Sequence, residues 1–309
     1  MKEIKIIFIN RSCFLHWIYY KWPTILKHLY KIYQKAKYII SLIPFENDYL
    51  FRKWGINSIL MNNFIPYNFN SIVPSDLSSK RILMIGRGDD KIKRLDLGIK
   101  AMQYIIKDIP ESEMLIISNL KGTNYLQKLT QQLNLKKTIK FVGYYSNPEQ
   151  LFRNASLHIF PTLAEAFPNV LSETLIYGIP NILVGLDYVS TAKGGTVIIY
   201  DESPLSIAKI AIKILLNKRL RKKLGKEARK NIKKFRNNLL LNKWIKLILS
   251  IYEGDDYYKK LQKEDIKINK NDALKIISNQ VYLLKKREKK FRNITIKDIE
   301  NFTYIESIN

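Results

Sequence analysis

Short apolar runs alternate with amphipathic stretches along most of this chain. The runs RILMIG (81–86), EMLIISN (113–119) and TIKFVG (138–143) are rich in aliphatic residues, and a stretch with helical spacing of its apolar positions follows each of them. A strand that leads through a helix into the next strand is typical of parallel α/β layers. The pattern therefore predicts an α/β fold.

The longest block of this alternation lies between residues 81 and 217. Six strands with interleaved helices form a doubly wound, Rossmann-like domain of ordinary size. The predicted strands are 81–86, 113–119, 138–143, 157–162, 181–185 and 196–200, and the predicted helices are 96–110, 125–135, 147–155, 168–178 and 204–217.

A shorter block with the same alternation precedes it. The predicted strands of this block are 4–9, 38–42 and 56–64, and its predicted helices are 24–36 and 46–55. Residues 66–80 contain Pro66, Pro74 and several serines with little periodicity, which is typical of a linker. The predicted units are a small Rossmann-like domain at 1–75, a second Rossmann-like domain at 76–225, a helix at 226–252 and a helical, charged tail at 253–309, in which 271–291 form one amphipathic helix.

The chain is strongly basic, with 53 Lys and Arg against 27 Asp and Glu and a net charge of +26. Three explanations are open: attraction to nucleic acid or an anionic membrane, a phosphate-bearing substrate, or a lysine-rich composition without a specific partner. The basic residues are densest at 218–234 and 283–292. We expect either a membrane-facing or a solvated surface there, and no specific nucleic-acid partner, because no nucleic-acid-reading motif is present.

Composition also limits the possible classes of protein. Hydrophobic residues make up 46% of the chain, which excludes wholesale disorder, and Cys13 is the single cysteine, which excludes an internal disulfide and a cysteine-based zinc site. No apolar run reaches the ~18 residues that a membrane-spanning helix needs, and the start does not have the form of a signal peptide. The expected location is cytoplasmic, with peripheral contact to the cytosolic face of a membrane as a secondary expectation.

The first candidate site is the loop from Gly86 to Arg94, between the strand at 81–86 and the following helix. Gly86 and Gly88 allow a close turn of the backbone, while Arg87 and Lys93 supply fixed charges that suit a phosphate. Ligands of open α/β sheets bind at the carboxyl ends of the strands, where this loop is expected. A solvated basic loop is the alternative interpretation.

The second candidate site follows the strand that ends in FPT (160–162). Pro168 suits the start of a helix, which places Glu165 in the preceding loop and Glu173 in the second helical turn. Both carboxylates are then able to face one crevice and accept hydrogen bonds from sugar hydroxyls. Alternatively, Glu165 is a helix-capping acid and Glu173 a surface residue.

Taken together, these residues point to a known family. The chain from 81 to 252 resembles the family 4 (group 1) glycosyltransferases of the GT-B fold. The most specific element is the spacing of Glu165 and Glu173 within EAFPNVLSETLIYGIP. The other matching stretches are GRGDDKIKRLDLGIKAM (86–102), FVGYYSNPEQLFRNASLHIFPTL (141–163) and KWIKLILSIYEG (243–254).

The resemblance implies a role for each candidate residue. Arg87 and Lys93 would contact the diphosphate of a UDP- or GDP-sugar, Glu173 would hold the ribose hydroxyls, and Glu165 would lie beside the sugar ring. The remaining donor-binding positions that it implies are Gly86 and the backbone around Phe167, Asn169 and Val170. It further implies transfer of a hexose-type sugar to a glycan, lipid-linked or protein acceptor with retention of configuration, without a metal or other cofactor.

The sequence departs from the family pattern in three places. The spacing from Arg87 to Lys93 is one residue longer than usual, so Lys91 is an alternative to Lys93. The loop after 113–119 keeps only Gly122 of its usual glycines. The acceptor-side domain at 1–75 is about half the size that the fold implies, and the helix at 226–252 would cross back to it.

The histidines do not settle the activity. The family usually places a histidine in the first domain, where His16 is the nearest candidate. The stretch 14–20 that contains His16 fits an aromatic core or docking patch equally well. We expect His28 and His158 to be packing residues. The shortened first domain also favours a second hypothesis, an inactive or partner-dependent nucleotide-sugar-binding subunit or truncated paralogue.

Overall fold

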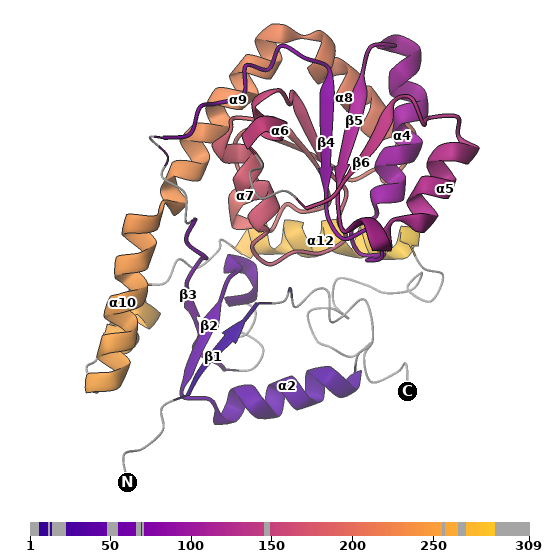
Figure 1. Ribbon diagram of the computed structural model, residues 1–309. Coiled ribbons are helices and arrows are strands. Elements are labelled where there is room, and N and C mark those ends of the chain that lie inside the picture. The colour runs from indigo at the N-terminus through magenta and orange to yellow at the C-terminus, as the bar shows by residue number, and fades with distance from the viewer. Residues whose placement is uncertain are drawn as a thin grey trace.

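The computed structural model describes residues 6–11, 13, 23–47, 55–65, 69, 71–144, 149–254, 257–264 and 270–287. Within these ranges the chain forms two parallel sheets, one of six strands and one of three. A helical segment near residue 250 packs beside the smaller sheet, and the last helix of the described chain lies beneath the larger one (Figure 1). The predicted α/β fold with two parallel units is therefore confirmed.

The larger sheet has the strand order β6-β5-β4-β7-β8-β9, and all of its neighbouring strands pair in parallel. The chain enters at β4, proceeds outward to β6, and then returns to place β7 on the other side of β4. The order of the sheet therefore reverses between β4 and β7. The strands are β4 (Arg81–Ile85), β5 (Glu113–Ile117), β6 (Ile139–Val142), β7 (Leu157–Phe160), β8 (Asn181–Val184) and β9 (Thr196–Ile199).

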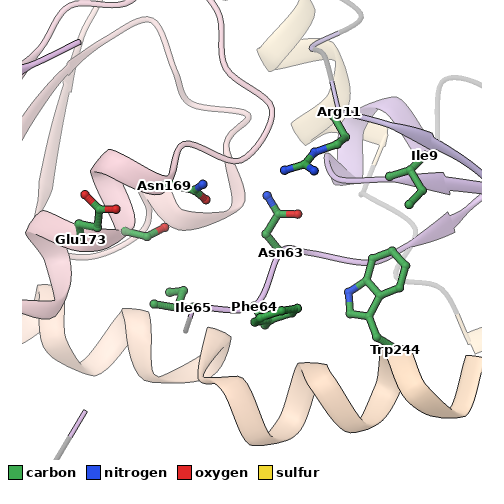
Figure 2. Close-up of a pocket in the computed structure, with 9 residues that line it drawn as sticks. Ile9, Arg11, Asn63, Phe64, Ile65, Asn169, Glu173 and Trp244 are labelled. Carbon is green, nitrogen blue, oxygen red and sulfur yellow. The ribbon is translucent and has the colours of Figure 1, made fainter. Parts of the chain in front are cut away.

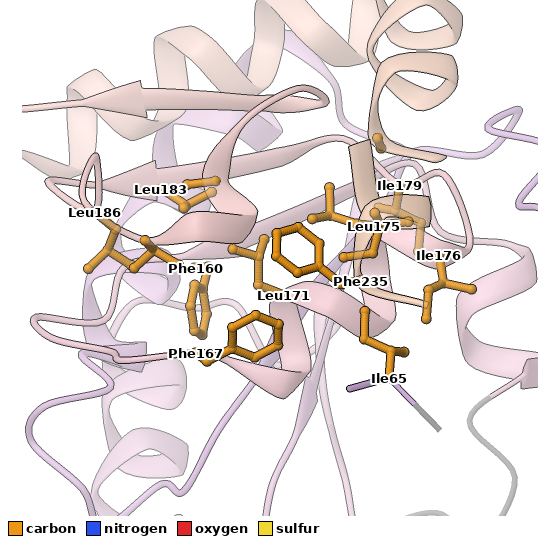
Figure 3. Packing of buried hydrophobic residues seen from close by; sticks show 14 of the residues in the cluster. Ile65, Phe160, Phe167, Leu171, Leu175, Ile176, Ile179, Leu183, Leu186 and Phe235 are labelled. Carbon is orange, nitrogen blue, oxygen red and sulfur yellow. The ribbon is translucent and has the colours of Figure 1, made fainter. Parts of the chain in front are cut away.

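Helices cover both faces of this sheet, and successive strand residues alternate between two cores. Ile82 and Met84 of β4 belong to the core under α4, α5 and α8, while Leu83 belongs to the opposite core, which includes α7 and α9 (Figure 3). Burial on both faces explains the nearly continuous apolar runs of these strands. The helices are α4 (Leu95–Asp108), α5 (Asn124–Gln132), α6 (Glu149–Arg153), α7 (Asn169–Ile176), α8 (Pro204–Leu216) and α9 (Lys218–Ile232).

The smaller sheet has the order β1-β2-β3 and is also parallel. Its strands are β1 (Ile7–Asn10), β2 (Tyr38–Ser41) and β3 (Ile59–Leu60), with α2 (Pro23–Lys35) between the first two. The third strand is shorter than the predicted 56–64. Residues 44–47, at the start of the predicted helix at 46–55, are helical, and residues 48–54 lie outside the described chain.

The helix predicted for 226–252 is replaced by two helices. Residue 226 lies inside α9, and after a short 3-10 turn at Lys233–Phe235 a second helix, α10 (Asn237–Glu253), begins. Phe235 is buried in the core of the larger unit, whereas Arg236 is extended and pairs with Ile65. The break therefore lies where the chain leaves the larger unit.

Helix α10 is the segment that returns to the smaller unit. Its Leu247 and Ile251 are buried in one cluster with Ile40 of β2 and Ile59 of β3, and the Trp244 indole donates a hydrogen bond to the Asn62 carbonyl at 3.3 Å. The tail continues as α11 (Tyr257–Glu264) and α12 (Lys270–Arg287). Among the described residues, none of the helices combines the length and apolar character needed to span a bilayer.

The three histidines differ in setting. His16 lies outside the described residues. His28 is exposed on α2, so its predicted packing role is wrong. His158 is fully buried in β7, as predicted, and its Nδ1 lies 2.5 Å from the Asn181 side-chain oxygen. Because that oxygen accepts, Nδ1 carries the proton, and protonation would place a second proton on the buried Nε2. Burial accordingly lowers the pKa of His158 to about 4.

We expect the stability of the protein to fall in acid in a way that depends on His158. The folded-state pKa lies below the value near 6.5 of the unfolded chain, so the unfolded state takes up the proton first as the pH falls from 6.5 to 4. Over that window the free energy of unfolding should decrease by roughly 3 kcal/mol. Urea titrations of wild type and His158→Phe between pH 4 and 7.5 test this, and parallel pH profiles would contradict it.

Two glycines with positive φ allow a matched test of packing. At Gly195 (φ +71°) an added Cβ would lie 2.3 Å from the Ala228 Cβ, whereas at Gly254 (φ +85°) it would meet no atom within 4 Å. Gly254→Ala should therefore cost only the left-handed strain of about 1 kcal/mol. Gly195→Ala should cost at least ~2 kcal/mol more, because α9 must move away from β9. Equal thermal shifts for the two variants would refute this interpretation.

Candidate functional site

The loops that follow β4 and β7 meet at the point where the strand order reverses. The Leu163 amide donates to the Ile92 carbonyl at 2.8 Å, and the Arg94 Nε donates to the Pro161 carbonyl at 2.7 Å. In open α/β sheets, ligands bind in the crevice outside the strand ends at such a reversal. The two loops that the sequence singled out are therefore joined at the position where a ligand is expected.

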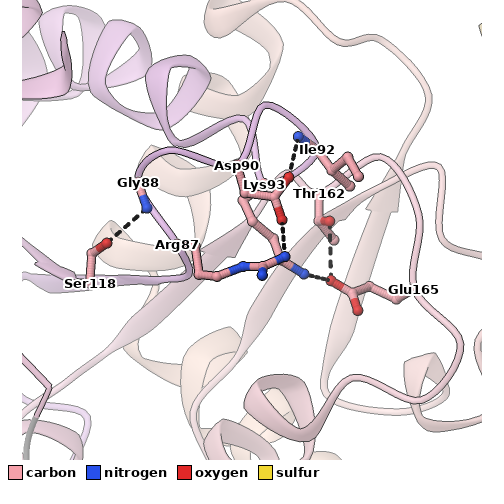
Figure 4. A network of polar contacts seen from close by, with 8 residues as sticks. All are labelled: Arg87, Gly88, Asp90, Ile92, Lys93, Ser118, Thr162 and Glu165. Carbon is pink, nitrogen blue, oxygen red and sulfur yellow. Dashed lines mark hydrogen bonds and ion pairs between the residues drawn. The ribbon is translucent and has the colours of Figure 1, made fainter. Parts of the chain in front are cut away.

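An ion pair between Lys93 and Glu165 bridges these loops. The Lys93 Nζ lies 2.5 Å from Glu165 Oε1, and the Thr162 hydroxyl donates to the same oxygen at 3.1 Å (Figure 4). The side chains of Lys93 and Glu165 are only 21% and 15% exposed. The pair is thus fixed in geometry and shielded from most of the solvent. Lys91 is exposed, so Lys93 is the lysine that contacts the acidic loop.

Close backbone approach shapes the first loop. A Cβ on Gly86 would lie 3.3 Å from Lys93 Cγ, so the glycine leaves room for the lysine stem. The Gly88 amide donates to the Ser118 hydroxyl at 2.9 Å, and a Cβ on Gly88 would lie 2.8 Å from the Gly122 carbonyl oxygen. Gly88 was expected from the sequence to allow a close turn, whereas Ser118 was missed. Ser118 follows β5 directly, so its place at a strand end was an available signal.

Arg87 lies apart from the Lys93–Glu165 pair. Its side chain is 67% exposed and forms a 2.6 Å ion pair with Asp90, whose other oxygen accepts from the Ile92 amide at 3.0 Å. Figure 4 shows the guanidinium on the same side of the loop as Glu165. The exposed guanidinium is therefore held at the rim of the crevice.

Arg94 is a further residue of this loop that the sequence analysis did not assign. It adopts a left-handed conformation (φ 47°) just before α4, which directs its side chain toward the loop after β9. There its Nη1 lies 2.7 Å from Glu202, and both side chains are largely buried. Arg94 thereby connects the loops after β4, β7 and β9.

Glu173 lies in a separate pocket between the two units. The pocket has a volume of about 420 Å³ and is shown in Figure 2. Glu173 and Asn169 enter it from α7, Arg11 from the end of β1 and Trp244 from α10. The other residues that line it are Ile9, Asn63, Phe64, Ile65 and Ser172.

The structure therefore divides the predicted site into two parts. Glu165 contacts Lys93 at the strand ends, whereas Glu173 lines the pocket beside the smaller sheet, and α7 connects them. Phe167 is buried and its ring packs edge-on against Phe235, so its side chain belongs to the core. Val170 packs partly against the same core. Among the described residues, no three His, Cys, Asp or Glu side chains gather as a metal site would require.

Comparison with known proteins identifies the relatives of this chain. The family model described as "Glycosyl transferases group 1" matches residues 69–231, which is more than half of the chain. A Campylobacter jejuni α-1,4-N-acetyl-D-galactosaminyltransferase that acts on an undecaprenol-linked glycan is 24% identical over 195 residues, which cover 60% of this chain and 53% of that protein.

Solved structures show the same fold. S. aureus TarM in complex with fondaparinux, α-GlcNAc-glycerol and UDP superimposes with a TM-score of 0.66 at 19% identity, covering 77% of this chain and 50% of that one. The Anabaena protein HepE in complex with UDP and glucose also gives 0.66, at 14% identity, covering 80% and 71%. The matches cover 21% to 53% of the length of the curated relatives. The fold is thus of the GT-B glycosyltransferase type.

The Lys93–Glu165 pair should show a measurable coupling in stability. Lys93→Met should lower the free energy of unfolding by about 2 kcal/mol, because it leaves a largely buried carboxylate whose remaining partner among the described residues is the Thr162 hydroxyl. The double variant Lys93→Met/Glu165→Gln should lose at least ~1 kcal/mol less than the sum of the single variants.

Lys100→Met is the matched control for this cycle. Lys100 pairs with Asp96 at 2.8 Å within α4, but its side chain is 37% exposed. Its loss should cost less than about 0.5 kcal/mol. Urea unfolding of the variants measures all of these values, and strict additivity at Lys93 and Glu165 would show that the two side chains are not coupled.

Proposed function

Since the chain belongs to the group 1 glycosyl transferases, we propose that it transfers a hexose-type sugar from a UDP- or GDP-sugar to a glycan, lipid-linked or protein acceptor. The proposal includes retention of the anomeric configuration and a reaction without a bound metal. The observation that carries it is the Lys93–Glu165 pair at the reversal between β4 and β7. This cation and this carboxylate lie together where a phosphate-linked sugar would enter.

The basic residues of the first loop suit the diphosphate of the donor. The bond between the sugar and the phosphate breaks with development of negative charge on the leaving oxygen. A cation already fixed near that oxygen stabilises the charge without reorganising during the reaction. Lys93 is held by Glu165, and the exposed Arg87 would contact the outer phosphate.

The acidic residues suit the hydroxyl groups of the donor. Glu165 is oriented by Lys93 and Thr162, so its second oxygen is in a defined position to accept from the transferred sugar. The pocket around Glu173 has a volume within the range of about 300–1,000 Å³ that small-molecule sites have. Its mixture of a carboxylate with the Trp244 and Phe64 rings suits a ribose and the apolar faces of a nucleoside.

Two related structures support the choice of nucleotide. TarM and HepE were each solved in complex with UDP, and HepE also with glucose. Their fold is the same as that of this chain, which supports testing the same nucleotide here. We therefore expect UDP to be the first nucleotide to test, followed by GDP.

The expected membrane contact is also a proposal. Helix α9 supports it, because its outward side chains are basic and exposed. These are Lys218, Arg219, Lys222, Lys223, Lys226 and Lys230. A cytoplasmic protein with such a surface would be attracted to an anionic leaflet.

A second candidate function is nucleotide-sugar binding without turnover. The small sheet has only three strands among the described residues, and the curated relatives extend well beyond the matched region. An acceptor site built from those further parts would then depend on a partner.

Binding and turnover measurements test both candidates. Calorimetry with UDP and GDP should give a binding heat, and Arg87→Ala and Glu173→Gln should each weaken the affinity at least tenfold, about 1.4 kcal/mol, because each removes a charged contact. In assays with UDP- and GDP-sugars, Glu165→Ala should abolish transfer and hydrolysis.

Lys137→Ala is the control, because Lys137 is an exposed cation just before the amino-terminal end of β6. The proposed site lies at the carboxyl ends of the strands. Its nucleotide affinity should equal that of wild type. Nucleotide binding with no turnover, unaffected by Glu165→Ala, would favour the binding subunit. The absence of heat with either nucleotide would reject both candidates.

A further inference from the structure

Helix α12 lies outside the residues that the family model matches, yet it packs against the functional end of the larger sheet. Figure 1 shows it beneath the strands, between the two units. The Gln280 side chain is 1% exposed and donates to the Gly185 carbonyl at 2.7 Å, immediately after β8. The helix is therefore attached at the carboxyl ends of the strands.

The contact between α12 and Gly185 is tightly packed. Leu283 is fully buried, and a Cβ on Gly185 would lie 2.3 Å from its Cδ1. Gly185 also has a positive φ of 66°. The glycine therefore both permits the turn after β8 and leaves the space that Leu283 occupies.

Asp187 is the polar centre of the same contact. Its carboxylate accepts from the Asn279 amide at 2.7 Å, the Tyr200 hydroxyl at 2.9 Å and the Gln280 amide at 3.4 Å. Burial raises the pKa of the Asp187 carboxyl. Two of these three donors come from α12, so the position of the Asp187 loop depends on the helix.

One route leads from Asp187 to the acidic side of the ion pair. The next residue, Tyr188, is 4% exposed, and its hydroxyl accepts from the Glu165 amide at 3.4 Å. Leu186 and Tyr188 belong to one apolar cluster, and Ile276 of α12 packs against it. A shift of the Asp187 loop would therefore reach the backbone of Glu165.

A second route leads to the basic side of the pair. Tyr200, which donates to Asp187 and lies 3.0 Å from the Asn279 amide, precedes Glu202 in the loop after β9. Glu202 pairs with Arg94, which follows Lys93 and donates to the Pro161 carbonyl. The two routes thus connect α12 to both members of the Lys93–Glu165 pair.

We propose that α12 is a positioning element of the donor site, and that Asn279 and Gln280, acting through Asp187, Tyr188 and Tyr200, hold the Lys93–Glu165 pair in place. The catalytic meaning of this role rests on the proposed function. The structural part of the proposal does not rest on it. That part states only that contacts of α12 hold the loops at 86–94 and 161–168 in fixed positions.

Exchange of hydrogen in the full chain, without any nucleotide, tests the structural part. Asn279→Asp places two carboxylates opposite one another, and Asp187→Asn replaces the charged acceptor of three hydrogen bonds with a neutral amide. In each variant, peptides that cover 161–168 should exchange on the order of tenfold faster. The double variant Asp187→Asn/Asn279→Asp exchanges donor and acceptor between the two sides, so it should return to within about threefold of wild type.

Lys285→Ala is the matched control, because Lys285 is exposed on the same helix. It should leave exchange at 161–168 unchanged. If the single variants fail to fold, Tyr188→Phe leaves the Asn279 and Gln280 contacts in place, removes the hydroxyl that accepts from the Glu165 amide and should still accelerate exchange there.

Kinetics with the donor found by the assays above test the catalytic part. Asn279→Asp should lower kcat more than tenfold while changing KM for the donor less than threefold, with recovery in the double variant. Faster exchange within 270–287 but unchanged exchange at 161–168 would overturn the proposal. If wild type binds neither nucleotide, the proposed function is wrong, but the hydrogen-exchange result still tests the role of α12 in holding the loops.

Discussion

The direct pairing of β4 with β7 is the constraint on which the site depends. Ile82 lies opposite Leu157 and Leu83 opposite His158, so the two strands end side by side even though two other strands lie between them in sequence. Their loops are then close enough for the Leu163 amide to reach the Ile92 carbonyl. A cation from one loop and a carboxylate from the other can share a hydrogen bond only because of this adjacency.

Burial around the paired strands β4 and β7 keeps their positions rigid. Every residue of β7 is buried, and the His158 imidazole is held by Asn181 of β8. A protein interior packs as densely as an organic crystal, so displacement of one strand disturbs its neighbours on both faces. The loops of the site are thus anchored on rigid elements, while their own polar contacts adjust the final positions of the side chains.

The second part of the site depends on the return of the chain to the smaller unit. Arg236 pairs with Ile65 as it leaves the larger core, and α10 then packs on β2 and β3. This places Trp244 in the wall of the pocket that Arg11 and Glu173 also line. Helix α12 contacts the loop that follows β8. Both α10 and α12 therefore pack beside the carboxyl ends of the strands.

Local pattern by itself determined much of this molecule. The strands of the larger sheet were predicted to within one or two residues, because strands buried on both faces are apolar throughout and end at glycine or polar residues. The glycine and cations after 81–85 and the acids around Pro168 were recognisable because strand ends are where such residues are expected. Periodicity, however, predicts only local secondary structure, and it does not indicate which distant segments come into contact.

Only the tertiary structure decided which charged groups meet. It paired Lys93 with Glu165 and placed Glu173 in a different pocket that Arg11 also lines. It also ended a helical turn at Phe235, next to the Arg236 backbone that pairs with Ile65. The attachment of α12 had no local signal, since Asp187 and Asn279 are ordinary polar residues until a fold buries them together. The order of strands in the sheet sets these distances, and that order depends on contacts between segments far apart in the sequence.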